Sequence, residues 1–262
     1  NLDVTSSITS QPYTGSPIIP TVTVTDGDKE LVEGTDYTVN VTNNENTGTA
    51  TVTITGIGNY EGSSGTTTFE ITPRVVDNLN VTSSITSQPY TGSPVIPAVT
   101  VTDGDRTLVE GTDYTVNVTN NENVGTATVT ITGIGNYEGS SGSTTFEITP
   151  RVVDNLDVTS SIDTRPYTGS PIVPGVTVMD GDRTMVEGTD YTVNVTNNEN
   201  VGTATVTITG IGNYEGSSGT TTFEITPKAV TVTANDVYKT FGQADPVLTV
   251  TVEGTAGSDT VS

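Results

Sequence analysis

Residues 48 to 56 read Gly48-Thr49-Ala50-Thr51-Val52-Thr53-Ile54-Thr55-Gly56, and this stretch decides the fold class. Ala50, Val52 and Ile54 alternate with threonines along its whole length. Such alternation is typical of a β-strand with one buried face, because successive side chains point to opposite faces of a sheet. Thr and Val are β-branched and suit a pleated, half-buried surface. We therefore predict a strand here, with its threonines facing water.

The same alternation occurs on both sides of this strand, at residues 21–25, at 37–42 and around Phe69 and Ile71. Turn-forming segments rich in Gly, Asp and Asn separate these runs, among them Asp26-Gly27-Asp28 and Asn43-Asn44-Glu45-Asn46. The short spacing leaves no room for a crossover helix, so antiparallel hairpins are expected. Because Ile54 and Ile57 are three residues apart, we also predict a β-bulge at Gly56.

The whole pattern occurs three times with a period of 77 residues, since Asn1-Leu2 returns as Asn78-Leu79 and Asn155-Leu156. Each copy closes on Phe-Glu-Ile-Thr-Pro, and we place domain boundaries after these prolines because Pro cannot donate to a β-ladder. The prediction is an all-β chain of tandem small antiparallel β-sandwich (Ig-like) modules arranged as an extended rod. The predicted domains are repeats of six or seven strands at 1–73, 74–150 and 151–227, followed by a partial β domain at 228–262.

The amino-acid composition excludes several classes of function. The 262 residues include 31 Asp and Glu but 8 Lys and Arg, a formal net charge of −23, which argues against nucleic acid and anionic lipid as partners. There is no Cys and no His, so disulfides, thiolate catalysis and the commonest general base and metal ligand are missing. The sequence contains no run of 18 apolar residues, so no membrane insertion is predicted. We expect that the protein is not an enzyme and that it has no catalytic, cofactor-binding or metal-binding residues.

The repeat resembles the Ig-like repeats of large bacterial cell-surface proteins and adhesins. The resemblance rests on Pro12-Tyr13-Thr14-Gly15, Val22-Thr23-Val24-Thr25-Asp26-Gly27, Glu33-Gly34-Thr35-Asp36-Tyr37, the stretch at 48–56, Gly58-Asn59-Tyr60 and Phe69-Glu70-Ile71. Residues 228–236 and 239–246 resemble the start of the bacterial MBG domain, with Phe241 where that family usually has Tyr. Half of such a domain would expose unpaired strand edges, so a truncated domain and a strand-completing partner for 228–262 are both open.

These resemblances imply stalk or spacer repeats that project a distal binding domain from a bacterial cell surface. The protein is then expected to be extracellular and anchored to the cell wall through parts outside this chain, with host glycan or protein bound by other parts. Two alternatives remain open. In the first, the repeats themselves bind glycan or host protein multivalently through loops such as Gly58–Gly65. In the second, they form part of an extracellular filament. Asn1–Ser262 is expected to be an excerpt of a longer protein.

Several residues are candidates for more specific roles. A Ca²⁺ site could use turn acids, although solvated turns are favoured over it; these acids are Asp26, Asp28, Glu33 and Asp36, their counterparts Asp103, Asp105, Glu110 and Asp113, and the boundary residues Asp3, Asp77 and Asn78. Tyr37 is in phase with core valines, whereas Tyr60 could be an exposed platform for sugars. Val75 and Val76 are expected to wedge between neighbouring repeats. Internal isopeptide cross-links are not expected, because Lys29 is replaced by Arg106 and Arg183 in the other copies.

Overall fold

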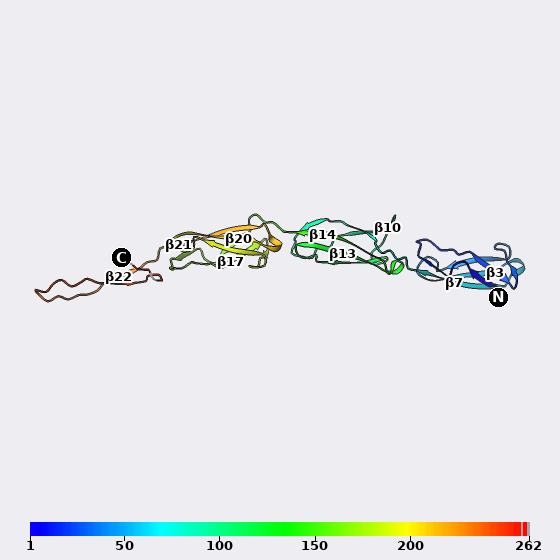
Figure 1. The fold of residues 1–262 in the computed structure, drawn as a ribbon, viewed down its shortest axis with the longest axis horizontal. Helices are drawn as coiled ribbons and strands as arrows, with labels where there is room; N and C mark the ends of the chain where they lie inside the picture. The colour runs from blue at the N-terminus through cyan, green and yellow to red at the C-terminus, as the bar shows by residue number, and fades with distance from the viewer. Residues whose placement is uncertain (258, 261–262) are drawn as a thin grey trace. The chain divides into compact units, whose positions relative to one another are not determined.

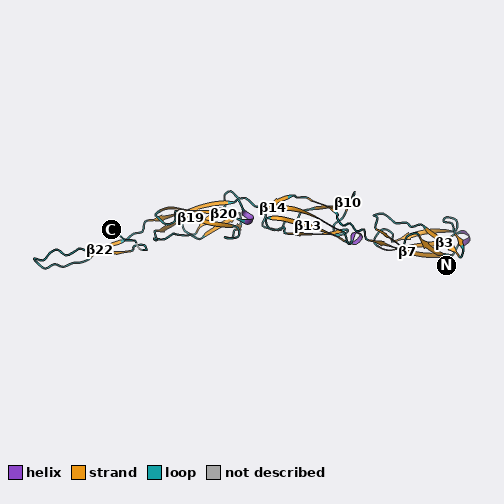
Figure 2. Ribbon diagram, viewed as in Figure 1, coloured by secondary structure: helices purple, strands orange, loops and turns teal. Residues whose placement is uncertain are grey.

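The computed structural model describes residues 1–257, 259 and 260, which Figure 1 colours by residue number. The chain divides into two compact units. Unit 1 comprises Asn1–Gln88 and Pro94–Ile148, and unit 2 comprises Pro89–Ser93 and Thr149–Ser262. β-Strands make up the regular structure, and within the described part of the chain the helices are three single 3-10 turns, drawn in purple in Figure 2. The all-β prediction is confirmed. The boundaries predicted after residues 73, 150 and 227 stay a prediction, because unit 1 contains most of two copies of the repeat.

The first copy of the repeat, in unit 1, has seven strands in two sheets. The strands are β1 (Asp3–Ser6), β2 (Ser10–Pro12), β3 (Val22–Asp26), β4 (Lys29–Glu30), β5 (Tyr37–Thr42), β6 (Gly48–Gly56) and β7 (Ser64–Thr72). One sheet has the order β1-β3-β4 and the other β2-β7-β6-β5. The four strands predicted from alternation are confirmed as β3, β5, β6 and β7. The short strands β1, β2 and β4 carry too little alternation to be recognised.

The other two copies repeat this arrangement. The second has β8 (Asn80–Ser83), β9 (Ser87–Pro89), β10 (Val99–Asp103), β11 (Arg106–Thr107), β12 (Tyr114–Thr119), β13 (Gly125–Gly133) and β14 (Ser141–Thr149). The third, in unit 2, has β15 (Asp157–Ser160), β16 (Thr164–Pro166), β17 (Val176–Asp180), β18 (Arg183–Thr184), β19 (Tyr191–Thr196), β20 (Gly202–Gly210) and β21 (Ser218–Thr226). A two-stranded sheet of β22 (Thr231–Ala234) and β23 (Val250–Glu253) follows.

The core of each copy lies between its two sheets and is made by the alternating apolar residues. Ala50, Val52 and Ile54 on β6 are fully buried, and Phe69 on β7 lies opposite Ala50 in the antiparallel register. The sheets approach closely at Gly65, where an added Cβ would lie 2.5 Å from a methyl group of Val4. A side chain at this position would therefore push β1 away from β7.

Two details of the prediction were wrong. β2 pairs with β7 in parallel, from Ser10 opposite Glu70 to Pro12 opposite Thr72, although antiparallel pairs alone were expected. A parallel pair without a crossover helix is possible because β2 and β7 come from opposite ends of the repeat, and the intervening strands supply the long connection. The bend that carries the chain from one sheet to the other is fixed by the Ser6 hydroxyl, which donates to the Ile8 carbonyl at 2.8 Å.

The predicted β-bulge at Gly56 is also absent. The register of β5 and β6 runs without interruption from Tyr37 opposite Gly56 to Thr42 opposite Thr51. β6 ends at Gly56, and the chain turns into the 3-10 helix η1 (Gly58–Tyr60). Ile57 is half-buried, and its amide donates to the Asp36 carbonyl at 2.8 Å, which anchors the turn to the preceding loop. The glycines therefore serve the turn, where Gly58 has φ +59°, and no extra residue is inserted into the strand.

The described residues include no helix with the length and apolar character needed to cross a membrane.

Candidate functional site

The most elaborate side-chain arrangement in unit 1 joins the first and second copies of the repeat. One half of it is the docking loop Pro12-Tyr13-Thr14-Gly15, which begins at the last residue of β2. The Tyr13 amide donates to the Thr72 carbonyl at 2.8 Å, which ties the loop to the end of β7. The Thr14 hydroxyl donates to the Ser16 carbonyl at 2.9 Å. The loop thus holds the Tyr13 ring at the end of the first copy, and the ring is only 6% exposed.

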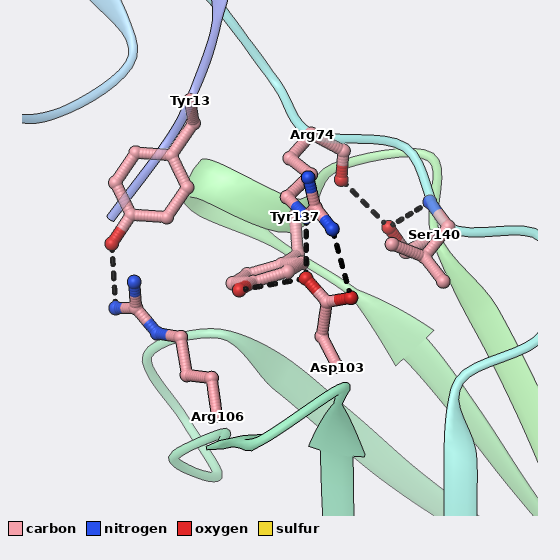
Figure 3. A network of polar contacts seen from close by, with 7 residues as sticks. Tyr13, Arg74, Asp103, Arg106, Tyr137 and Ser140 are labelled. Atoms are coloured by element: carbon pink, nitrogen blue, oxygen red, sulfur yellow. Dashed lines mark hydrogen bonds and ion pairs between the residues drawn. The ribbon is translucent and has the colours of Figure 1, made fainter. Parts of the chain in front are cut away.

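The other half is the acceptor cluster of Asp103, Arg106, Tyr137 and Ser140 in the second copy. Tyr13 meets Tyr137 edge to face, with ring centroids 5.8 Å apart and planes at 76°. The Arg106 guanidinium lies 5.1 Å from the Tyr13 centroid and donates to the Tyr13 hydroxyl at 2.6 Å (Figure 3). Edge-to-face aromatic pairs and cations near ring faces are both attractive because of the ring quadrupole. The docking loop is therefore held by three kinds of contact at one point.

An ion pair lies beside the two rings. Arg74, the first residue after the proline that closes the first copy, bonds Asp103 through two nitrogens, Nε to Oδ2 and Nη2 to Oδ1 (Figure 3). The Tyr137 hydroxyl donates to the same carboxylate at 3.4 Å. A bidentate guanidinium–carboxylate pair fixes orientation as well as distance. Arg74 therefore sets the direction in which the connecting segment leaves the first copy.

Backbone contacts complete this joint. The Ser140 hydroxyl donates to the Arg74 carbonyl at 3.0 Å and accepts from the Val76 amide at 2.9 Å (Figure 3). The Arg74 amide donates to the Asn136 carbonyl at 2.9 Å, and the Asn136 side-chain oxygen accepts from the Thr47 amide at 2.9 Å. The connecting segment is thus bonded along its length and does not behave as a free linker.

The electrostatics of the joint follow from these contacts. The hydrogen bond from Arg74 lowers the pKa of the Asp103 carboxyl against the opposing effect of burial. Burial raises the pKa of the Tyr137 hydroxyl. Burial acts to lower the pKa of Arg106, but the hydrogen bond to Tyr13 and the field of the Tyr137 hydroxyl raise it overall. At neutral pH the cluster therefore contains charged Arg74, Arg106 and Asp103 next to the neutral hydroxyl of Tyr137.

Unit 2 contains the same arrangement. Tyr90 meets Tyr214 with ring centroids 5.7 Å apart and planes at 77°, and Arg183 lies 5.2 Å from the Tyr90 centroid. Arg151 pairs with Asp180, which also accepts from the Tyr214 hydroxyl at 3.2 Å. Burial raises the pKa of Tyr214 to about 12. Two independent occurrences of one contact set show that the sequence of the repeat encodes the joint.

Comparison with known families identifies the family to which the repeat belongs. A family described as lipoprotein associated domain matches residues 1–73 and 76–150, which is more than half of the chain. The chain belongs to the lipoprotein associated domain family. A second family, described as MBG domain (YGX type), matches residues 230–262 and confirms the MBG resemblance of the C-terminal segment. Together these matches suggest a cell-envelope or surface protein with repeated β domains.

Searches for individual relatives add little. No curated protein matches the chain. Among solved structures, the extracellular cadherin domains 3–6 of Protocadherin Gamma B2 match with 10% identity, covering 87% of this chain and 77% of theirs. Their TM-score of 0.22 is too low to carry a conclusion about fold or function.

The third docking loop of the lipoprotein associated domain repeats meets the MBG segment. Tyr167 is the counterpart of Tyr13, and a hydrogen bond with Asp259 raises its pKa. An added Cβ at Gly169 would lie 3.2 Å from the Ala256 backbone. Lys228, which replaces Arg74 at the equivalent position, donates to the Thr255 carbonyl at 3.3 Å. The MBG segment therefore occupies the same end of the third copy, with different chemistry.

The first acceptor cluster of the lipoprotein associated domain repeats differs from the other two. Asp26, Lys29 and Tyr60 stand where the second copy has Asp103, Arg106 and Tyr137. Lys29 donates to the Tyr60 hydroxyl at 3.0 Å and lies 5.1 Å from the ring centroid. Within the described residues, no second tyrosine ring packs on Tyr60.

The predicted Ca²⁺ candidates do not assemble into a site within the described residues, where no group of three or more acids is placed to hold a metal. Asp103 is engaged by Arg74. The Asp113 carboxylate accepts from the Val109 amide at 2.9 Å, and Asp36 accepts from the Val32 amide at 3.0 Å. These two acids thus close turns of their own loops. The expectation that the chain needs no metal stays a prediction.

Tyr37 is buried as predicted. The candidate sugar platform Tyr60 is half-buried, whereas its counterparts Tyr137 and Tyr214 are each only 1% exposed and belong to the joint. Of the two valines expected to wedge between repeats, Val75 is 59% exposed and Val76 is half-buried. The signal that was missed is the recurrence of Tyr-Thr-Gly together with a basic residue three positions after Asp103 and Asp180, at Arg106 and Arg183.

Proposed function

We propose that the chain is a spacer in a bacterial cell-surface adhesin, in which tandem repeats hold a distal binding domain away from the cell wall. The role is structural, without catalysis and without a resident cofactor. The distal domain, and not the repeats, meets the host glycan or protein. The observation that carries the proposal is the repeated joint of tyrosine, arginine and aspartate, because a spacer must resist bending where its modules meet.

Stiffness is supported by the contact chemistry of that joint. Tyr13 and Tyr137 are almost fully buried, and Arg74 is held in a bidentate ion pair, so bending at this point would expose two rings and break charged hydrogen bonds. The connecting segment after Pro73 has no Gly or Ser, which would make it a flexible linker. The net charge of −23 opposes association between neighbouring chains on a crowded surface.

Small-angle X-ray scattering on the intact chain tests the proposal. The nine residues of β6 span about 30 Å at about 3.3 Å per residue, so three such modules in line predict a maximum dimension of roughly 90 Å or more. A compact globule of this chain length would instead have a radius of gyration of about 18 Å. A scattering curve of the compact kind would refute the spacer.

A variant with both Tyr13→Ala and Arg106→Ala distinguishes a stiff spacer from a flexible chain of beads. The double variant is expected to broaden the distribution of dimensions, because the side chains that hold the docking loop are removed. Lys29→Ala is the matched control, since Lys29 contacts Tyr60 within its own copy. If the double variant scatters like the parent chain, the joint does not stiffen the molecule.

A further inference from the structure

The first acceptor cluster offers a docking surface that the described chain does not use. The cluster consists of Asp26, Lys29, Tyr60 and Ser63. We propose that this surface binds the docking loop of another copy of the repeat, linked in tandem ahead of residue 1. The inference rests on the proposed function, because it extends the same series of joints by one module.

Burial shows that this surface is open where its counterparts are closed. Tyr137 and Ser140 are each 1% exposed, whereas Tyr60 and Ser63 are only half-buried. Asp26 is exposed, and among the described residues it has no ion-pair partner, while its counterpart Asp103 is held by Arg74. The difference lies in what covers the cluster and not in the fold beneath it, because the strands of the two copies have the same order.

The chemistry of the cluster specifies its occupant. Tyr60 presents a ring, Lys29 a cation above that ring and Asp26 a free carboxylate, which are the groups that receive a tyrosine and an arginine in the second copy. The loop must also bring a glycine beside its tyrosine. At Gly15, φ is +83°, which favours glycine, and an added Cβ would lie 2.1 Å from an Arg106 nitrogen, so a side chain there would displace the cation. A copy of the repeat satisfies all of these requirements, because it supplies a Pro-Tyr-Thr-Gly loop near its start and a basic connecting residue after its last strand.

A second molecule of this chain is a poorer occupant. Each docking loop in the described chain is already engaged: Tyr13 by Tyr137 and Arg106, Tyr90 by Tyr214, and Tyr167 by Asp259. A loop donated by another molecule would first have to leave its own joint. A tandem copy brings a loop without that cost.

The test lengthens the chain by a copy of residues 78–154 placed directly before Asn1. The added copy supplies a docking loop with the counterpart of Tyr90 and a connecting residue with the counterpart of Arg151. Tetranitromethane nitrates exposed tyrosines, and mass spectrometry of tryptic peptides then measures how far Tyr60 has reacted. The peptide that contains Tyr60 differs in sequence from those of the other copies, and fragmentation separates Tyr60 from Tyr37 within it. Tyr137 of the parent chain serves as the protected standard, because the added copy duplicates its tryptic peptide in the lengthened chain.

In the parent chain Tyr60 is expected to react, and in the lengthened chain its nitration is expected to fall to the level of Tyr137. The matched control carries Tyr→Ala and Arg→Ala at those two counterpart positions of the added copy, and there Tyr60 is expected to stay reactive. Unchanged reactivity in the lengthened chain overturns the proposal, and so does equal protection by the control. If Tyr60 of the parent chain is already as unreactive as Tyr137, the surface is not open and the proposal is overturned.

A concentration series on the parent chain separates the two sources of a loop. Protection of Tyr60 that grows with concentration points to a second molecule and overturns the tandem assignment. The nitration result does not depend on the dimensions of the chain, so its failure is distinguishable from failure of the spacer proposal, which scattering decides on the parent chain alone.

Discussion

A double-mutant cycle between Tyr13 and Arg106 measures whether the two copies in unit 1 are energetically joined. The single variants are Tyr13→Ala and Arg106→Ala, and the cycle isolates the interaction between the two side chains from their separate effects. Tyr13 lies in the docking loop and Arg106 is an exposed residue of β11, so each variant is expected to fold.

The magnitude follows from the geometry. The guanidinium donates a 2.6 Å hydrogen bond to the hydroxyl and lies 5.1 Å from the ring centroid. A hydrogen bond that involves a charged group contributes about 1.5–3 kcal/mol, and a cation beside an aromatic ring adds about 0.5–1 kcal/mol at exposed sites. Because Arg106 is largely exposed, water competes for its protons and the lower part of each range applies. We therefore expect a coupling free energy of about 2 kcal/mol.

Urea unfolding followed by far-ultraviolet circular dichroism supplies the free energies, with each chain measured at the same protein concentration. The control cycle pairs Tyr13→Ala with Lys29→Ala, and its coupling is expected to be zero within error, since Lys29 contacts Tyr60. A coupling between Tyr13 and Arg106 below roughly 0.3 kcal/mol, the usual error of additivity, would refute the reasoning that these contacts bind the two copies together.

Other perturbations of the joint have equally definite outcomes. Since Arg74 lowers the pKa of Asp103 below its usual 3.8, the ion pair stabilises the fold above that pH, and stability is expected to fall as the pH drops further. The Asp103→Asn variant should lose less stability over this acid range than the parent chain, because only the matching Asp180 pair remains. Burial raises the pKa of Tyr214 from 10 to about 12, so its contribution to stability is present below pH 10 and lost between pH 10 and 12, and ultraviolet titration of Tyr214→Phe should lack the latest-ionising hydroxyl. Gly15→Ala should destabilise the chain more than Gly27→Ala in thermal melts, because both have positive φ at a cost of about 1–3 kcal/mol but Gly27 has open space around it. Equal losses at the two glycines would show that Arg106 simply moves aside.

The strands could be predicted from the sequence because each long strand has one buried face. Alternation at residues 48–56 and around Phe69 reports that burial directly, and the residues that it assigns to the core are buried. The parallel pairing of β2 could not be predicted in this way. β2 has three residues, and its direction is set by the bend at Ser6 and by which sheet has an unpaired edge, neither of which alternation describes.

The joint could not be predicted because its residues carry ambiguous signals. Tyr60 and Tyr137 have the same neighbours in sequence, yet one is half-buried and the other fully buried. Their burial depends on whether a docking loop from elsewhere in the chain covers them. Local patterns contain no information on that partner, which lies more than 120 residues away in the case of Tyr13 and Tyr137.

The variation between copies nevertheless follows the joint once its geometry is known. The position of the cation changes from Lys29 to Arg106 and Arg183, and the connecting residue changes from Arg74 and Arg151 to Lys228 where the MBG segment follows. Lysine is a compact point charge, whereas arginine forms planar bidentate contacts. The connecting residue is arginine at each joint that has paired tyrosine rings, and it is lysine where the partner is the MBG segment. The substitutions therefore track the chemistry of the neighbouring module, which is the pattern expected if each repeat is adapted to what it contacts and the rest of its sequence only has to maintain the sandwich.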